Sequence, residues 1–447
     1  MKFITAVFLL FMIFASSHAQ NYVTTYAGDG TNGYADGDTA ACKFKGPFGM
    51  CIDHLNNLYI ADNTNHRIRK ISSDGIVSTL AGTGIAGYAD GPDSSAQFNA
   101  PSDLCADAAG NIYVSDFQNQ YIRKISIDGM VSTIAGNGIA GYVDGSPGTA
   151  EFNYPRGICI DAQGNLFIAD SWNHRIRRID AGGNVSTLAG NSDTIGVQSP
   201  GDFADGNDTA ARFNVPCGMS IDSAGNLYLA DAYNHRIRKI TNGGIVTTIA
   251  GSGAIGAANG GFLDGDTSMA LLNTPTEVFF DNKEGKIFIA DSYNNRIRML
   301  QNNNVSTVAG NGSSGFENGI DTASSFRTPR GIVTGTSGNH VYVCDNGNHV
   351  IRKISLSINT GLELIQTQQD FRLFPNPASG MVWVSSMGRS GAIYISDIFG
   401  KQVFFSESEC EISPCMAMVN SLPDGMYVVT VVSENGRLAT EKLMIAR

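Results

Sequence analysis

Short runs of alternating apolar and polar residues recur along most of the chain. Between residues 47 and 82 they read PFGMCI, NLYIAD, RIRKI and IVSTLAG, and similar sets follow as far as residue 355. Runs of this length with a period of two predict half-buried β-strands rather than helices. Turn sequences such as DAQGN and DSAGN separate the first two runs of a set, which predicts antiparallel hairpins.

An aspartate ends the second run of every set and gives the repeat its period. Successive members lie 54, 54, 61, 60 and 54 residues apart. A period of this length predicts supersecondary units that stack or radiate, and four antiparallel strands per unit favour the blade of a β-propeller. The six aspartates are Asp62, Asp116, Asp170, Asp231, Asp291 and Asp345.

The order of the runs predicts how the propeller closes. Six sets contain the first three runs, but the fourth pattern already occurs in YVTTYAG at residues 22–28 and is missing after the sixth set. We therefore expect the N-terminal strand to complete the last blade, which removes the exposed edges of an open ring. The predicted fold class is all-β: a six-bladed β-propeller closed by the N-terminal strand, followed by a small C-terminal β-sandwich.

The two ends of the chain differ from the repeats. Lys2, an apolar run over residues 3–15 and small residues at Ser17 and Ala19 predict a signal peptide at residues 1–19. No later segment is apolar for long enough to predict a transmembrane span. The predicted propeller covers residues 20–356, a polar linker covers 357–370, and short strand patterns indicate a separate domain at 371–447.

Cysteines occupy one equivalent position in three of the first runs, at Cys51, Cys105 and Cys159. The first strands of different blades lie too far apart for a disulfide, so we predict that these cysteines are small buried apolar residues. Cys410 and Cys415 are close enough in sequence to be bridged, and the sequence leaves open whether they are.

The repeated motif is similar to a known one. The stretch GNLYLADAYNHRIRKI at residues 225–240 resembles the NHL repeat, whose family forms six-bladed propellers, and the likeness covers residues 21–356. Some propellers of that family bind RNA through a basic face. Here the formal net charge is −11 and the basic segments are distributed around the ring, so we expect no nucleic-acid partner.

The last 77 residues contain the motifs FRLFPNPASGMVWVS, AIYISDIFGKQVF and SLPDGMYVVTVV. They resemble the C-terminal sorting domain of type IX secretion substrates. The resemblance implies that the type IX machinery is a partner, that the protein is secreted or held on the outer-membrane surface of a bacterium, and that this domain is cleaved. It leaves open whether the mature protein is attached or released. The matching positions are Pro375, Asn376, Pro377, Gly400 and Gly425.

Positions that are identical in all six sets are predicted to shape the blades. We expect each aspartate to accept backbone N–H groups at its strand end, and the asparagine three residues later to adopt the left-handed conformation. The arginine seven residues after the aspartate should be paired within or between blades, because a buried guanidinium needs a partner. Examples are Asp62 with Arg69, Asp170 with Arg177 and Asp231 with Arg238.

Four histidines also share one loop position. Symmetry keeps them apart, so we expect loop hydrogen bonds rather than a metal site, and they complete no Ser-His-Asp or Cys-His catalytic set. They are His66, His174, His235 and His349.

Positions that differ between blades are the candidates for function. In the turn between the second and third runs, the middle residue is aromatic only in blades three to five, as Trp172, Tyr233 and Tyr293. Two connections longer than the others, residues 189–216 and 250–275, flank blade four. Exposed aromatic rings suit a sugar or a peptide, and the alternative is that the same rings only cover blade edges.

The first run opens with Pro-x-Gly in four sets. Asp103 and Glu277 replace the glycine in blades two and five, whereas Arg156 and Arg330 precede it in blades three and six. Opposite blades face each other in a six-fold ring, so these four charges can converge at the channel mouth. Carboxylates there can hold a cation such as Ca²⁺ or orient a polar ligand, or they can be merely solvated. No other cofactor is indicated.

Two functions therefore remain open. The first is an exported binding or adhesion scaffold that recognises a carbohydrate, peptide or protein through the loop rim, without catalysis. The alternative is a metal-assisted enzyme at the channel, because propellers similar to this one include lactonases and lyases. That alternative rests on fold analogy, with Asp103 and Glu277 as its only candidate residues.

Overall fold

The computed structural model describes residues 21–191, 201–256 and 258–356, and in the C-terminal region residues 371–374, 381–386, 390–397, 402–406, 415–419, 422–433 and 438–445. It divides into two compact units, Met1–Ile358 and Asn359–Arg447. The predicted signal peptide and linker lie outside the described residues. So do Pro375, Asn376, Pro377, Gly400 and Cys410 of the sequence predictions.

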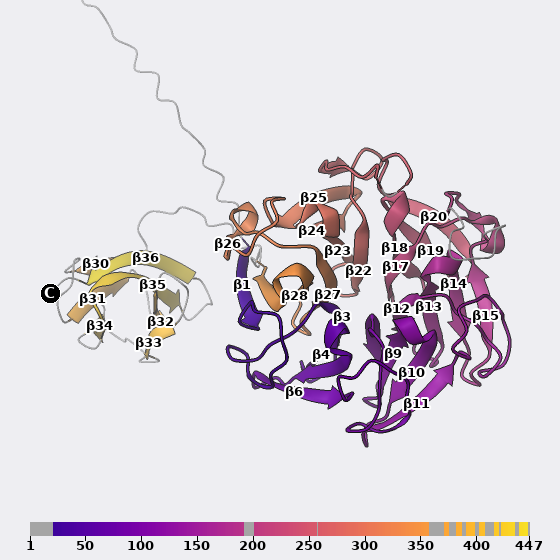
Figure 1. The fold of residues 1–447 in the computed structure, drawn as a ribbon. Coiled ribbons are helices and arrows are strands. Elements are labelled where there is room, and N and C mark those ends of the chain that lie inside the picture. The colour runs from indigo at the N-terminus through magenta and orange to yellow at the C-terminus, as the bar shows by residue number, and fades with distance from the viewer. Residues whose placement is uncertain are drawn as a thin grey trace, which may run out of the picture. The chain divides into compact units, whose positions relative to one another are not determined.

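Six antiparallel sheets form the first unit, and the colours of Figure 1 pass from one sheet to the next around a ring. The first strands are β3 (Pro47–Ile52), β8 (Asp103–Ala106), β12 (Pro155–Ile160), β17 (Pro216–Ile221), β22 (Pro275–Asp281) and β27 (Pro329–Thr334). Each contacts the first strand of the next blade, and β27 contacts β3, so these strands surround the axis. The fold is therefore the predicted six-bladed propeller.

The second and third strands follow outward in each blade. The second strands are β4 (Leu58–Asp62), β9 (Ile112–Asp116), β13 (Leu166–Asp170), β18 (Leu227–Asp231), β23 (Lys286–Asp291) and β28 (His340–Asp345). The third strands are β5 (Arg67–Ile71), β10 (Tyr121–Ile125), β14 (Arg175–Ile179), β19 (Arg236–Ile240), β24 (Arg296–Gln301) and β29 (Val350–Ser355).

One turn of 3-10 helix joins the second strand of each blade to the third. These turns are η1 (Asn63–Asn65), η2 (Phe117–Asn119), η3 (Ser171–Asn173), η5 (Ala232–Asn234), η6 (Ser292–Asn294) and η8 (Asn346–Asn348). Two further turns, η4 (Asp208–Ala210) and η7 (Asp321–Ala323), lie in the long connections between blades.

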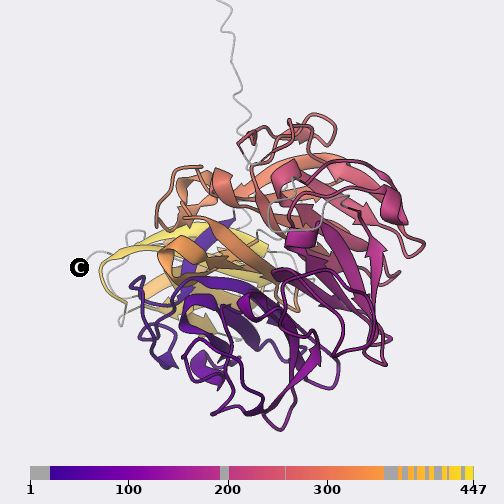
Figure 2. The same cartoon turned by 45° about the vertical axis from the view of Figure 1, so that its right-hand side comes forward.

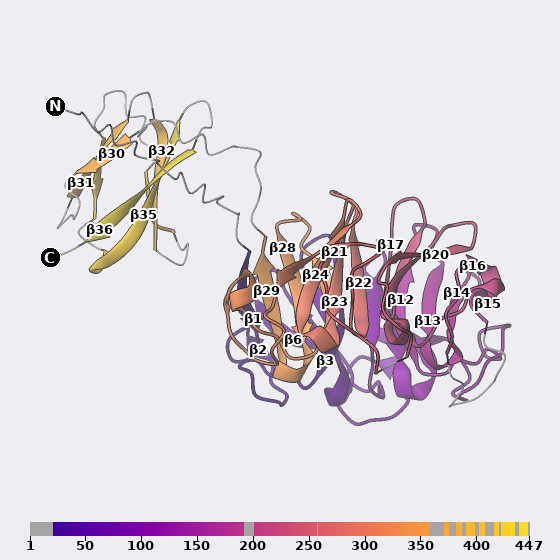
Figure 3. The ribbon, with the colours of Figure 1, turned by 90° about the horizontal axis from the view of Figure 1, so that it is seen from above.

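The fourth strands are β1 (Tyr22–Ala27), β6 (Ile76–Ala81), β11 (Met130–Ala135), β15 (Val185–Ala189), β20 (Ile245–Ala250) and β25 (Asn304–Ala309). Strand β1 pairs with β29, with Tyr22 opposite Ser355 and Val23 opposite Ile354. Figures 2 and 3 show this indigo strand beside the orange strands of the last blade. The predicted closure of the ring by the N-terminal strand is confirmed.

The outer edge of five sheets carries a further two-residue strand, which the sequence pattern did not predict. These strands are β2 (Gly37–Asp38), β7 (Gly91–Pro92), β16 (Gly206–Asn207), β21 (Gly265–Asp266) and β26 (Gly319–Ile320). Each comes from the connection that enters its own blade and pairs with the fourth strand, as Gly37 does with Val77. The connection thereby covers an edge that would otherwise be open to pairing with another chain.

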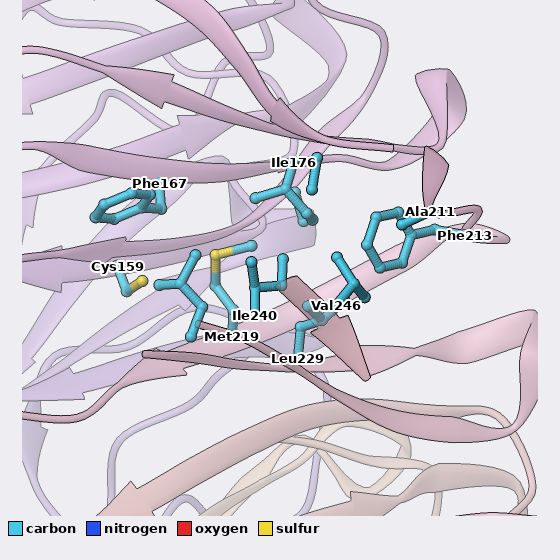
Figure 4. Packing of buried hydrophobic residues seen from close by; sticks show 12 residues of the cluster. Cys159, Phe167, Ile176, Ala211, Phe213, Met219, Leu229, Ile240 and Val246 are labelled. Carbon is cyan, nitrogen blue, oxygen red and sulfur yellow. The ribbon is translucent and has the colours of Figure 1, made fainter. Parts of the chain in front are cut away.

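Apolar side chains fill the space between neighbouring blades. Figure 4 shows the cluster between the third and fourth blades, with Phe167 and Ile176 from one blade and Met219 and Leu229 from the other. Phe213, from the connection between the two blades, packs into the same cluster. The equivalent Phe44, Phe98, Phe152 and Phe326 are also fully buried. Five connections therefore contribute one phenylalanine ring each to an inter-blade core, and the connection that enters blade five contributes the buried Leu272 at the same position.

A buried ion pair organises each blade. The guanidinium of Arg69 lies 2.8 Å from Asp62 Oδ2 and 2.6 Å from Asp36 Oδ1, and it donates to the carbonyls of Lys43 and Ala35. Arg177 and Arg238 make the same pairs with Asp170 and Asp231, at 2.7 and 2.6 Å. The arginine thus joins the second and third strands to the connection that precedes the blade.

Most of the remaining groups of this cluster are also used, although Arg69 Nε has no hydrogen-bond partner. Asp62 Oδ1 accepts the N–H of Lys45, and Oδ2 accepts a hydrogen bond from the Asn65 side chain, which also donates to the carbonyl of Gly33. The Arg69 guanidinium lies between the rings of Tyr34 and Phe44, at 4.9 and 5.1 Å from their centres. Hydrogen bonds and aromatic faces together offset the cost of burying this charge.

The left-handed residue of the turn is not the asparagine that we predicted. Asn65 is the last residue of η1, and the next residue, His66, has a φ of 52°. The prediction was wrong because the asparagine side chain is needed for the bonds to Asp62 and Gly33, which a helical backbone supports.

The left-handed residue that follows the 3-10 turn links each blade to the next blade. Its side chain accepts the backbone N–H of the residue before the next blade's opening proline, and that residue is left-handed too, as at Val215 with a φ of 53°. A β-branched residue with positive φ is strained, so this bond holds an unfavourable conformation. The six bonds, 2.6–3.1 Å long, join His66 to Ala100, Gln120 to Tyr154, His174 to Val215, His235 to Thr274, Asn295 to Thr328 and His349 to Gly46.

The second unit contains two sheets, as predicted for a small sandwich. One sheet has the order β30 (Phe371–Phe374), β31 (Met381–Ser386) and β34 (Cys415–Met418), and the other has β33 (Gln402–Ser406), β32 (Ser390–Asp397), β35 (Gly425–Ser433) and β36 (Leu438–Ile445). Ile395, Val429 and Leu443 are fully buried. Gly425 opens β35 with a φ of 157°.

Within the described residues, no helix is long and apolar enough to cross a membrane. Cys105 and Cys159 are buried, Cys51 is partly buried, and all three are free thiols. Burial raises the pKa of each of these thiols, which makes them poor nucleophiles.

We predict that Arg177→Ala destabilises the propeller by about 3–5 kcal/mol, because it leaves buried Asp170 without its cation. Chemical denaturation of the mature protein measures the change. The control is Arg178→Ala, which removes an exposed neighbouring arginine and should change the stability by less than about 0.5 kcal/mol. Equal stability of the two variants would show that the buried pair is dispensable.

The histidine bonds predict a loss of stability in acid. Burial lowers the pKa of His66, His235 and His349, so the unfolded chain binds more protons as the pH falls below about 6.5. The stability from these groups is complete above the unfolded pKa and is lost as the pH falls through the folded pKa. Replacing all three by glutamine, which blade two uses naturally as Gln120, should reduce the fall in melting temperature between pH 7.5 and 5.

The control for this prediction is His54→Gln, at an exposed hairpin position. It should retain the wild-type dependence of the melting temperature on pH. If the triple variant also loses stability in acid as steeply as the wild type, the histidine bonds do not cause the pH dependence.

Candidate functional site at the axial ring

The start of every first strand lies at the same face of the propeller as the 3-10 turns. In the first blade Pro47 pairs with Asp62, and η1 begins at the next residue. The residue after each opening proline therefore lies near the axis on this face. We call these six residues the axial ring: Phe48, Ser102, Arg156, Cys217, Thr276 and Arg330.

Two arginines occupy opposite members of the axial ring. Arg156 Nη1 lies 3.4 Å from Cys217 Sγ, and its Cζ lies 5.3 Å from the ring centre of Phe117. Arg330 Cζ lies 4.3 Å from the ring centre of Phe48. The Nε atoms of both arginines are buried without a hydrogen-bond partner. Within the described part of the chain, no carboxylate forms an ion pair with either guanidinium.

The two guanidinium groups act on each other. Burial and then the charge of Arg156 lower the pKa of Arg330 to about 10. Arg330 therefore stays protonated at neutral pH, and the axial ring concentrates two positive charges. This arrangement differs from that of Arg69 or Arg177, where two carboxylates and two carbonyl oxygens surround each guanidinium.

Two of the predicted rim aromatics lie close to these arginines. The phenol groups of Tyr293 and Tyr233 both act electrostatically on Arg330. Tyr233 packs against Val215 and Cys217, and Gly256 of the long connection donates its N–H to the Tyr233 carbonyl at 2.8 Å. The side chain of Tyr293 is 54% exposed. The long connection after blade four thus supports Tyr233, while Tyr293 presents its ring to solvent.

The third predicted aromatic belongs to a different group. Trp172 contacts Tyr154 with 5.9 Å between ring centres, and Tyr154 contacts Phe117 at 4.8 Å. Among the described residues no ring contact joins Trp172 to either tyrosine. We did not predict Phe117, Tyr154 or Phe48 from the sequence. Phe117 could have been found from the sequence, since it lies in the turn between the second and third strands of blade two. It is one position before the middle residue of that turn, which is the position that we compared between blades.

Asp103 and Glu277 lie one residue deeper and are both buried. Asp103 Oδ2 accepts the N–H of Ile158 at 3.0 Å, and its Oδ1 fills the space beside Gly49 of the preceding blade. Glu277 fills the equivalent space beside Gly218. These two glycines are required, because a Cβ at either position would overlap a carboxylate oxygen at 2.2 Å or less. The two acids therefore bridge neighbouring first strands.

Burial also sets the protonation of these acids. It raises the pKa of Asp103 to about 7, and burial together with the charge of Asp103 raises the pKa of Glu277 well above its usual value. At neutral pH the pair thus carries less than its formal negative charge. The structure consequently separates the four predicted charges into a buried acidic pair and an arginine pair, with no ion pair between them among the described residues.

This arrangement does not fit Ca²⁺. A calcium ion takes six to eight oxygen ligands, whereas no group of three or more His, Cys, Asp or Glu side chains in the described residues is placed to hold a metal. Asp103 is also engaged with backbone.

Comparison with known proteins identifies the parts of the chain. Residues 152–179 match the NHL repeat, residues 198–361 match the Teneurin NHL domain, and residues 372–446 match the secretion system C-terminal sorting domain. The chain thus contains NHL repeats followed by a secretion sorting domain. That domain indicates that the protein is secreted or attached to the outer-membrane surface of a bacterium.

Known relatives share the repeat region. Protein SUPPRESSOR OF QUENCHING 1, chloroplastic, of Arabidopsis thaliana is 31% identical over 295 residues, covering 63% of this chain and 27% of that protein. NHL repeat-containing protein 2 of Bos taurus is 30% identical over 347 residues, covering 70% and 47%. The chain therefore spans less than half the length of these two relatives.

Solved structures share the fold. A protein of unknown function from Bacteroides thetaiotaomicron superposes with a TM-score of 0.56 at 18% identity, covering 75% of this chain and 76% of that one. An auxiliary nutrient binding protein from Bacteroides ovatus has a TM-score of 0.56 at 16% identity, covering 76% and 77%. At these identities the likeness concerns the fold alone.

The buried acids predict a pH effect opposite to that of the histidines. Because the folded pKa of Asp103 is raised to about 7, its contribution to stability is complete below the unfolded pKa and is lost as the pH rises through 7. Asp103→Asn keeps the acceptor for the Ile158 N–H but cannot ionise. Its melting temperature relative to wild type should rise by at least roughly 2–4 °C between pH 5 and 8.

The matched control for this substitution is Asp74→Asn, at an exposed turn position. Its difference from wild type should be independent of pH. A difference for Asp103→Asn that is equally independent of pH would contradict the protonation assigned to the buried pair.

Proposed function

We propose that the mature protein is an exported binding protein that captures a carbohydrate, peptide or protein ligand at the axial ring and the adjoining rim. In this proposal residues 1–19 are a cleaved signal peptide, residues 20–356 form the binding domain, and residues 357–370 link it to a sorting domain at 371–447. The type IX secretion machinery recognises the sorting domain and exports the chain.

The observation that carries this proposal is the pair of guanidinium groups of Arg156 and Arg330. They have no carboxylate partner among the described residues and lie near the rings of Tyr233 and Tyr293. The repeat explains arginines of the third strands such as Arg69 and Arg177 through their buried pairs, but it does not explain these two arginines of the first strands. Charged groups that lack an internal partner, next to exposed aromatic rings, are typical of ligand sites.

The fold is compatible with binding and does not identify the ligand. Two structural neighbours carry the description auxiliary nutrient binding protein, at 16–17% identity. The neighbours described as lyases or as a gluconolactonase have TM-scores below 0.5 and support no comparison of function. The buried positions of Asp103 and Glu277 give the binding role the advantage over the enzymatic one.

The test is a ligand screen on carbohydrate and peptide arrays with the mature protein, the Tyr233→Ala/Tyr293→Ala double variant, and Leu55→Ala as control. Leu55 is 60% exposed in the hairpin turn at the opposite face. The double variant should lose about 2 kcal/mol of binding free energy, roughly thirtyfold in affinity, because rim aromatics would contribute most of the contact. Equal binding by the double variant and the control would exclude the rim as the ligand-binding surface.

A further inference from the structure

We propose that Arg156 and Arg330 form an anion site that receives the acidic group of an anionic carbohydrate, a carboxylate or a sulfate on a sugar. This inference rests on the proposed function, since it assigns the chemistry of the ligand at the same site. It goes further because it commits to one group on the ligand and to the two residues that bind it.

The first support is the unused hydrogen-bonding capacity of the two side chains. A guanidinium has five N–H donors, and in the repeat arginines most of them are used: Arg177 donates to Asp170, Asp144 and the carbonyls of Glu151 and Val143. Among the residues that the structure describes, the axial arginine side chains donate one hydrogen bond, a weak one from Arg156 to Cys217 Sγ at 3.4 Å. Planar oxyanions match the remaining donors.

The second support is the sign of the charge. The chain has a formal net charge of −11, so long-range electrostatics oppose the approach of an anion. Two guanidinium groups from opposite members of the axial ring, without carboxylate partners among the described residues, provide a local positive site on that acidic protein. The nearest acids do not cancel it, because burial raises the pKa of both Asp103 and Glu277 and their oxygens are directed to Ile158 N–H and the two glycines.

The third support points to a sugar rather than a peptide. Tyr293 exposes its ring beside Arg330, and an aromatic face suits the flat apolar side of a pyranose. A peptide would bind most simply by extending a sheet, yet the exposed sheet edges lie at the outside of the propeller, where the short strands such as β2 and β7 cover them. The axial face offers charge and aromatic rings but no sheet edge.

The experiment is calorimetric titration of the mature protein with three polymers: polygalacturonate, which carries carboxylates, dextran sulfate, which carries sulfates, and neutral dextran. Wild type should bind at least one of the two polyanions and not dextran. Arg156→Ala and Arg330→Ala should each weaken that binding at least about tenfold, equivalent to about 1.4 kcal/mol. The control Lys283→Ala also removes one positive charge, from an exposed hairpin at the opposite face, and should change binding less than twofold.

Melting temperatures show whether an arginine variant loses binding only because it is less stable. Since Arg156 and Arg330 repel each other and neither forms an ion pair with a described carboxylate, Arg330→Ala should melt no lower than wild type, in contrast to Arg177→Ala. A clear drop in the melting temperature of Arg330→Ala would make it a structural residue and overturn the proposal.

The binding outcomes are equally decisive. Failure of wild type to bind either polyanion, or equal binding by the arginine variants, overturns the anion site. The proposed function survives that result if the arrays reveal a neutral glycan or an acidic peptide whose binding the tyrosine double variant loses. Binding of polygalacturonate alone or dextran sulfate alone identifies the acidic group as carboxylate or sulfate.

Discussion

The buried aspartate–arginine pair is the interaction on which each blade depends. Burying two charges is favourable only when nearly every donor and acceptor of both is used. Here the arginine reaches its own hairpin partner, an acid in the preceding connection and two carbonyls, while the aspartate accepts an amide and an asparagine, as at Arg69 and Asp62. The cluster therefore fixes the hairpin and the connection together, and the rest of the connection is free to vary.

The last blade shows how this constraint tolerates an exception. Arg352 pairs with Asp345 as elsewhere, but its second partner is the amide oxygen of Asn318, at 2.9 Å, instead of an aspartate. The same blade receives its fourth strand from the other end of the chain. Asp321 and Asn21 exchange hydrogen bonds there, with the Asn21 N–H donating to Asp321 Oδ1 at 2.7 Å and the Asp321 N–H to the Asn21 carbonyl at 2.9 Å. Backbone pairing and these polar contacts stabilise the last blade, which has one ion pair fewer than the other blades.

The fold was predictable because its determinants are local and repeated six times. Strand period, turn residues and the displaced fourth strand in YVTTYAG gave the blade count and the closure. The direction of the Asp103 and Glu277 side chains was not predictable, since it depends on space left by Gly49 and Gly218 in neighbouring blades. The left-handed residue was misassigned for a similar reason: the Asn65 side chain is needed for a bond to the carbonyl of Gly33, which lies in the connection before the blade.

The two kinds of buried arginine give the strongest physical argument about function. Arg177 is surrounded by acceptors, so removing its charge would leave buried acids uncompensated, whereas Arg330 experiences the charge of Arg156 and forms no ion pair with a carboxylate in the described part of the chain. An internal carboxylate at the axial ring would have stabilised the empty protein, but a ligand would then have had to displace it. Without that carboxylate, the anion that we propose as ligand would lose no binding energy to a broken salt bridge. The acids closest to the axis are buried one residue deeper and bonded to backbone, a position from which they do not compete for the guanidinium groups.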